Sequence, residues 1–152
     1  MLENKKIIIT GIANKFSIAN GIAKSMSKNG AELAFLYQNE RLLKRIKPIA
    51  EELGVATLVE CDVSSDDSID KAFSEIKTKW GKVDGLVHSI GFAPSDQLEG
   101  DFTEVTTREG FKIAHDISSY SFTALAKAAL PILSENAALL TLTYLGSIHS
   151  PP

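Results

Sequence analysis

The segment Lys6-Ile7-Ile8-Ile9-Thr10-Gly11 decides the fold. Its β-branched run contains no alternating polar residue, so it predicts a strand that is covered on both faces. The run stops at a glycine, and residues 17–29 then carry apolar side chains at helical spacing, with Gly30 just past the end of the helix. A buried strand that turns into a helix predicts the opening unit of a parallel α/β sheet.

The same alternation continues along the chain. Further strands are predicted at residues 33–37, 57–61, 85–90 and 138–144, helices at 40–53, 65–81 and 106–130, and a loop at 91–105. Ser65, followed by two aspartates, predicts a cap at the start of the third helix. Pro48 predicts a kink or break in the second helix, and Thr106 with Glu109 predicts a capping box at the start of the last one. With right-handed crossovers, this alternation predicts a doubly wound parallel sheet of about five strands. By analogy with other doubly wound sheets, we expect the strand order 3-2-1-4-5.

The composition limits the possible functions of the chain. Lys and Arg number 16 against 19 Asp and Glu, and this net charge of −3 leaves no basic excess for nucleic-acid phosphates. No signal peptide and no apolar run of membrane-spanning length is found. The single cysteine, Cys61, excludes a disulfide framework, and no metal-ligand spacing is present. We therefore expect one soluble cytoplasmic domain without nucleic-acid, membrane or metal partners.

The loop after the first strand is a candidate phosphate site, since ligands of such sheets bind beyond the C-terminal ends of the strands. Its sequence is not GxGxxG, but Gly11 permits a sharp turn. Ser17 could cap the next helix and present its hydroxyl and amide to a pyrophosphate, while Ala19 allows close helix–sheet contact. An ordinary βα loop with a serine cap explains the same residues equally well.

The next two strand ends carry polar residues. Gln38 stands where NAD sites typically place Asp or Glu for the ribose, and Arg41 could meet a 2′-phosphate, so the sequence leaves the choice between NADH and NADPH open. Asp62 beside Val63 could hold an adenine amino group and flank its ring. Asp62 could instead simply start a turn.

The last two strand ends complete the candidate site. Ser89-Ile90-Gly91-Phe92-Ala93 offers small residues against which a flat ring could lie. The preceding His88 and the lone Cys61 are predicted to be packed core residues. The Tyr144 phenol could donate a hydrogen bond to a carbonyl oxygen, or it could be a half-buried packing residue.

Together these segments resemble the bacterial enoyl-acyl-carrier-protein reductases, a divergent branch of the short-chain dehydrogenases. The matching segments are Gly11-Ile12-Ala13, Ser17-Ile18-Ala19, Tyr37-Gln38-Asn39, Cys61-Asp62-Val63 and residues 88–93, 107–111, 114–121 and 140–146. The resemblance implies a Rossmann-like NAD-binding domain over residues 1–146 and a divergent tail over residues 147–152. A flavodoxin-like or response-regulator fold would share the alternation, but the acidic cluster expected at the first strand is missing.

The resemblance also implies a reaction. Family members use NADH to reduce the double bond of an enoyl thioester on acyl carrier protein, in fatty acid synthesis, and look like homotetramers. The positions that would contact NADH are Gly11, Ser17, Ile18, Gln38, Asp62, Val63, Ile90 and Gly91. Ala93 would lie at the substrate wall, and Tyr144 would be the first of two active-site tyrosines, its hydroxyl stabilising an enolate oxygen.

The sequence departs from the family pattern after Gly146. The family continues into a helix carrying Tyr-x6-Lys and into further strands, whereas residues 147–152 read Ser-Ile-His-Ser-Pro-Pro. We therefore expect a C-terminally truncated reductase with little activity, and an apolar sheet edge at 138–144 that favours aggregation. Two alternatives stay open: a dinucleotide-binding module without chemistry, and an interaction module or remnant of an interrupted gene.

Overall fold

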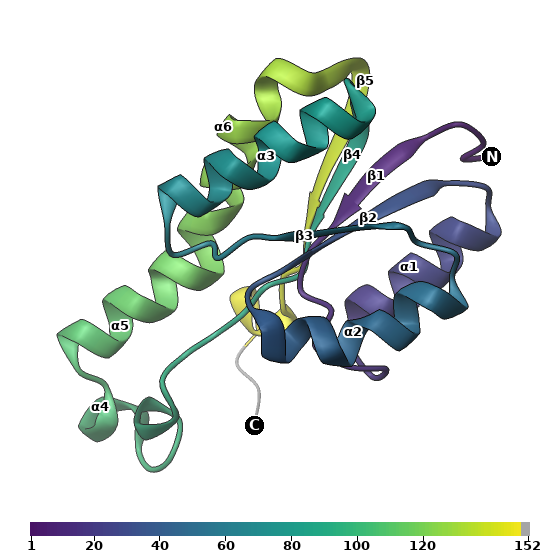
Figure 1. Cartoon of the computed structure of the whole chain (residues 1–152). Helices are drawn as coiled ribbons and strands as arrows, with labels where there is room; N and C mark the ends of the chain where they lie inside the picture. Colours follow the sequence, from purple (N-terminus) through teal and green to yellow (C-terminus); the bar gives the residue numbers. More distant parts are fainter. Residues whose placement is uncertain (150–152) are drawn as a thin grey trace.

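The structure is a computed structural model that describes residues 1–149, so the last three residues of the predicted tail lie outside the described part. Five parallel strands form one sheet in the order β3-β2-β1-β4-β5 (Figure 1), which confirms the predicted order. The strands are β1 (Lys6–Ile9), β2 (Glu32–Tyr37), β3 (Thr57–Glu60), β4 (Val83–His88) and β5 (Leu133–Thr141).

Helices cover both faces of this sheet. The α-helices are α1 (Ile18–Lys28), α2 (Glu40–Glu52), α3 (Asp66–Trp80), α4 (Phe102–Val105), α5 (Arg108–His115) and α6 (Ser121–Ala129). Short 3-10 turns lie at η1 (Ser95–Gln97), η3 (Leu130–Ile132) and η4 (Leu145–Ser147), and a π-helical turn, η2 (Asp116–Tyr120), joins α5 to α6. Figure 1 shows α1 and α2 on one side of the sheet and α3, α5 and α6 on the other. No helix in the described part is long and apolar enough to cross a membrane.

The isoleucines of β1 explain the absence of polar alternation in this strand. Ile7 and Ile9 pack in the core cluster beneath α1 and α2, whereas Ile8 packs in the cluster beneath α3 and α6. All three side chains are at most 5% exposed. Burying each one stabilises the fold by about 1.5–3 kcal/mol, so the sheet centre anchors both layers.

Two predicted helix features had different outcomes. Ser65 caps α3 as predicted, because its hydroxyl accepts a hydrogen bond from the Ser68 amide. Of the kink or break predicted at Pro48, the break is wrong, since α2 continues through Pro48 to Glu52. Pro48 and Lys44 are both exposed, so water can satisfy the Lys44 carbonyl that lacks an N–H donor.

The capping box predicted at Thr106 and Glu109 was wrong by one residue. Thr106 ends α4, and the helix cap is Thr107, whose hydroxyl accepts from the Gly110 amide at 3.0 Å. The Gln97 side-chain oxygen fixes this position because it accepts from both the amide (2.7 Å) and the hydroxyl (3.1 Å) of Thr107. The single long helix predicted over 106–130 is also interrupted by the π turn.

Strand β5 begins five residues earlier and ends three residues earlier than the predicted strand at 138–144. An irregularity in its pairing with β4, between Val83 and Gly85, accommodates the polar residues 134–136, which hydropathy alone does not assign to a strand. Far from the C-terminal strand ends, Asp84 accepts hydrogen bonds from the Lys6 amide (3.0 Å), the Lys5 ammonium (3.1 Å) and the Ser134 hydroxyl (2.9 Å). These bonds join β1, β4 and β5.

Candidate functional site

A cavity of about 540 Å³ lies at the C-terminal ends of β1 to β4. Its lining consists of Thr10, Gly11, Ile12, Ala13, Leu36, Tyr37, Gln38, Leu42, Cys61, Val63, Ser64, Ser89, Ile90, Gly91, Phe92, Ile113 and Ile117. The volume and the mixture of apolar walls with a few polar groups are typical of a small-molecule site. The cavity also lies where the connections from β1 and β4 diverge, which is where doubly wound sheets bind ligands.

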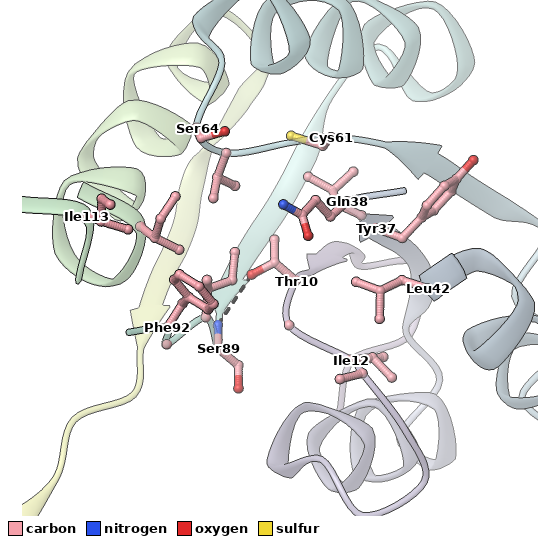
Figure 2. Close-up of a pocket in the computed structure, with 17 residues that line it drawn as sticks. Thr10, Ile12, Tyr37, Gln38, Leu42, Cys61, Ser64, Ser89, Phe92 and Ile113 are labelled. Carbon is pink, nitrogen blue, oxygen red and sulfur yellow. Dashed lines mark hydrogen bonds between the residues drawn. The ribbon is translucent and has the colours of Figure 1, made fainter. Parts of the chain in front are cut away.

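The floor of the cavity is made where the ends of β1 and β4 touch. Thr10 Oγ1 donates to the Val87 carbonyl (3.1 Å) and accepts from the Ser89 amide (3.3 Å; Figure 2). Gly11 has a φ of +82°, and a Cβ there would overlap the Ser89 carbonyl oxygen. The glycine is therefore required both by its backbone conformation and by the close approach of the β4 loop.

Ser17 does not cap α1 through its side chain, contrary to the prediction. It stands at the N-cap position, but its hydroxyl accepts from the Ala13 amide (3.0 Å) and the Asn14 amide (3.1 Å). The reason is the length of the loop, which folds back and brings its own amides to the serine. The Ser17 hydroxyl hydrogen has no acceptor among residues 1–149, so the group can still donate to an anion at the helix start.

Gln38 and Asp62 meet at the β2–β3 end of the cavity. Gln38 Nε2 donates to Asp62 Oδ2 at 3.4 Å, and Asp62 Oδ1 accepts from the Ser64 amide (3.0 Å) and hydroxyl (2.7 Å). Burial acts to raise the pKa of Asp62, but these hydrogen bonds outweigh it and hold its pKa below the usual range. A carboxylate thus stands beside the uncharged Gln38, whose side chain reaches into the cavity in Figure 2.

The β4 end of the cavity combines a loop with one helix. Residues 89–92 form the loop side, and Ile113 and Ile117 approach them from α5 and the π turn. Neither isoleucine was predicted from the sequence as a site residue. Their spacing of four residues marks one face of a helix, but sequence alone does not say that this face meets the end of β4.

His88 and Cys61, two further groups at or near the cavity, are buried and unreactive at neutral pH. His88 is 1% exposed and its ring lies between Ser121 and Thr141, which confirms the predicted core histidine. Desolvation lowers its pKa. Cys61 is 4% exposed, and burial together with the neighbouring Asp62 charge raises its pKa to about 12, so it stays a thiol at neutral pH.

The structure brings together only part of the residue set predicted from the sequence. Gly11, Gln38, Val63, Ile90 and Gly91 line the cavity, and Asp62 adjoins it through Gln38. Ser17, Ile18, Ala93 and Tyr144 are not part of the lining, and Tyr144 is 70% exposed. The binding and catalytic roles given to all these residues remain predictions. Among residues 1–149, no group of acidic, histidine or cysteine side chains could hold a metal ion.

Known proteins match the chain over almost its full length. The sequence profile of a family described as Enoyl-(Acyl carrier protein) reductase matches residues 11–152. The enoyl-[acyl-carrier-protein] reductase [NADH] FabI of Escherichia coli (strain K12) is 56% identical over 151 residues, which are 99% of this chain and 58% of the relative. The protein of the same name from Enterococcus faecalis is 47% identical over 151 residues, which are 99% of this chain and 59% of the relative.

Solved structures agree with these relatives. An enoyl-[acyl-carrier-protein] reductase (NADH) from Aquifex aeolicus VF5 superposes with a TM-score of 0.95 at 45% identity, over 99% of this chain and 60% of that protein. The Anaplasma phagocytophilum reductase, solved in complex with NAD, gives a TM-score of 0.94 at 40% identity, over 99% of this chain and 58% of that protein. This chain thus spans somewhat more than half the length of the relatives it matches, and by sequence and structure it belongs to the enoyl-acyl-carrier-protein reductase family.

Proposed function

We propose that this chain carries the NADH-binding part of a cytoplasmic enoyl-acyl-carrier-protein reductase that acts in fatty acid synthesis. The observation that carries the proposal is the cavity at the switch point between β1 and β4, with the Gln38–Asp62 pair at one end and residues 89–92 at the other. A dinucleotide has a polar adenosine end and a planar nicotinamide end. The two ends of the cavity offer matching chemistry.

The adenosine half of the ligand is assigned to the β2–β3 end. Gln38 supplies an amide that both donates and accepts, and the Asp62 carboxylate can accept from a ribose hydroxyl or an adenine amino group. Val63 lines the same end and would flank the ring. A negative charge at Asp62 would repel a 2′-phosphate, so this geometry favours NADH over NADPH.

The pyrophosphate and the nicotinamide are assigned to the remaining residues. Gly11 lets the backbone approach closely, and Ser17 and Ile18 lie at the positive end of the α1 helix, an eleven-residue helix. Ile90 and Gly91 would lie against the nicotinamide, with Ala93 beyond them on the substrate side. Bound NADH would supply the hydride; Tyr144 would donate its O–H to the thioester carbonyl oxygen of an acyl-carrier-protein substrate.

Little turnover is expected from these 152 residues alone. These 152 residues hold no tyrosine or lysine after Tyr144, so the second tyrosine and the lysine of the family pattern are not among them. Loss of one transition-state donor typically lowers a rate by about 10²–10³. The chain would then act as a dinucleotide-binding module, which is the second candidate function.

Calorimetry with NADH and NADPH tests the binding proposal. We expect NADH to bind more tightly than NADPH, and Asp62→Asn to weaken NADH binding about tenfold, because a hydrogen bond to a charged group is lost. Asp67→Asn, an exposed aspartate in the first turn of α3, is the matched control and should leave binding unchanged. Equal affinity for the two cofactors, or no effect of Asp62→Asn, would contradict the assignment.

Oxidation of NADH by a crotonyl thioester separates the two candidate functions. Under identical conditions we expect at least a hundredfold lower rate than for the Escherichia coli relative. A rate comparable to that relative would show that Tyr144 and the described site suffice for catalysis.

A further inference from the structure

One helix holds both ends of the 88–92 segment. At the β4 end, His88 Nε2 lies 2.8 Å from the Ser121 hydroxyl. At the loop end, the Ser118 hydroxyl accepts from the Phe92 amide at 2.9 Å and donates to the Phe92 carbonyl at 3.0 Å. The residues between these contacts, Ser89, Ile90 and Gly91, line the cavity together with Phe92.

The hydrogen bonds around His88 define a single neutral tautomer. Ser121 Oγ donates its hydrogen to the Ile117 carbonyl at 2.7 Å, so it meets the histidine as an acceptor. Nε2 must therefore carry the ring hydrogen. Nδ1 then accepts from the Thr141 hydroxyl at 2.9 Å, which ties β5 to the same ring. The Phe122 ring, whose centroid lies 5.4 Å from that of His88, completes an apolar surround, and burial lowers the pKa of the histidine.

The π turn places these two serines. Ser118 lies within η2, and Ser121 begins α6 directly after it. Residues that are three apart in a helix lie on the same side of it. Here that side faces the end of β4. Ile117, in the same turn, contributes to the cavity lining. Such π turns are rare within α-helices and are frequently found at functional sites.

We propose that Ser118 and Ser121 are positioning residues that clamp the 88–92 segment at both ends and thereby hold the wall against which the nicotinamide half of the dinucleotide lies. This inference rests on the proposed function. Among residues 1–149, the side chains of Gln38 and Asp62 are hydrogen-bonded to each other and to Asn39 and Ser64, and not to Ser118 or Ser121. The clamp therefore acts on one end of the cavity and leaves the other unchanged.

The first test needs no ligand. Amide hydrogen exchange measured by NMR on the full chain should show the Phe92 amide exchanging about tenfold faster in Ser118→Ala, because its acceptor is removed. Ser118→Thr keeps a hydroxyl and should restore slow exchange. Ser119→Ala, at an exposed neighbouring position of the same turn, is the control. Unchanged Phe92 exchange in Ser118→Ala would overturn the clamp.

The second test separates positioning from general damage. Ser118→Ala should weaken NADH binding about five- to tenfold and leave binding of ADP, which lacks the nicotinamide, unchanged. Equal weakening of both ligands would overturn the positioning role. If the unmutated chain binds ADP as tightly as NADH, the nicotinamide half adds no affinity and the nicotinamide assignment is wrong. If it binds neither ligand, the proposed function and that assignment fail together, while the exchange experiment still decides whether Ser118 holds Phe92.

Discussion

The two ends of the cavity are stabilised in different ways. At the β1–β3 end, the strand centres lie between helices on both faces, and Ile7, Ile8 and Ile9 are at most 5% exposed. At the β4–β5 end, β5 pairs only with β4 within the described residues, and Leu139 and Leu140 are 38% and 45% exposed. Apolar burial fixes the first end. At the second end, β4 is buried but β5 is not, and side-chain hydrogen bonds from Ser118, Ser121 and Thr141 hold residues 88–92. The same kind of mutation should therefore have unequal consequences in different parts of the sheet.

Gly11 is the point where both ends meet, and its replacement should have the largest effect. In Gly11→Val, the left-handed backbone is strained and the side chain overlaps the Ser89 carbonyl. We expect the free energy of unfolding, measured by urea denaturation, to fall by more than about 3 kcal/mol.

A glycine in open space provides the control for Gly11. A Cβ at Gly21 of α1 meets nothing within 4 Å. Gly21→Ala should therefore stabilise the chain by about 0.5–1 kcal/mol, because alanine is the better helix former. A similar loss of stability in both variants would mean that the contact with Ser89 is not the cause.

Leu86 and Leu139 are neighbours in the β4–β5 ladder and compare core with edge directly. Leu86 is fully buried, so Leu86→Ala should cost about 2–5 kcal/mol of unfolding free energy. Leu139→Ala should cost less than about 1 kcal/mol, because its side chain is partly in water already. Comparable losses in urea denaturation would contradict the contrast between the buried strand β4 and the exposed edge strand β5.

The exposed edge also predicts self-association. No charged residue occurs between positions 136 and 148, so β5 lacks the charges that usually protect an edge strand. Leu139→Lys should reduce light scattering by the concentrated chain relative to Leu139→Ala. An equal tendency to associate in both variants would show that the chain does not self-associate through this edge.

Asp84 joins β1, β4 and β5 near the N-terminal ends of these strands, opposite the cavity. The pKa of its carboxyl lies below the usual range, chiefly because the carboxylate accepts a hydrogen bond from the Lys6 amide. Burial opposes this shift in part, and the contacts with Lys5 and Ser134 add to it. Its contribution is therefore present above the ordinary aspartate pKa and lost as the pH falls through the lowered value. Asp84→Asn should cost about 1–3 kcal/mol at pH 7 and much less in acid, whereas the exposed Asp70→Asn should show no such change.

His88 should give a modest effect on stability that depends on pH. Because burial lowers its pKa in the folded state, the unfolded chain takes up a proton first. Stability from neutral His88 is complete above pH 6.5 and declines below it by at most about 1.4 kcal/mol per pH unit. Urea denaturation from pH 7 to 5 should lose this slope in His88→Asn and keep it in His115→Gln, at an exposed site.

The periodic parts of the fold could be predicted from sequence because their signals are local. The isoleucine run of β1 and the βα alternation indicate the parallel sheet, and Ser65 marks the start of α3. Contacts between distant residues set the features that were missed. Gln97 moves the cap of α5 to Thr107, and pairing with β4 draws the polar residues 134–136 into β5.

The candidate site divides in the same way. Gly11, Gln38 and Gly91 follow strands directly, so the topology alone brings them to one cavity. The bond between Gln38 and Asp62, the inward-folded Ser17 and the two serines that hold residues 88–92 all depend on side-chain geometry that no spacing rule encodes.

The strand order also has a consequence for the timing of folding. Strands β1, β2 and β3 can pair as soon as residue 60 has left the ribosome, but Ile7 must wait for Gly85 before its second edge is closed. During synthesis, the most apolar strand of the protein therefore passes through a stage in which it is half paired. Contacts of such long sequence separation form slowly, which makes the arrival of β4 the step that commits the nascent chain to its native topology.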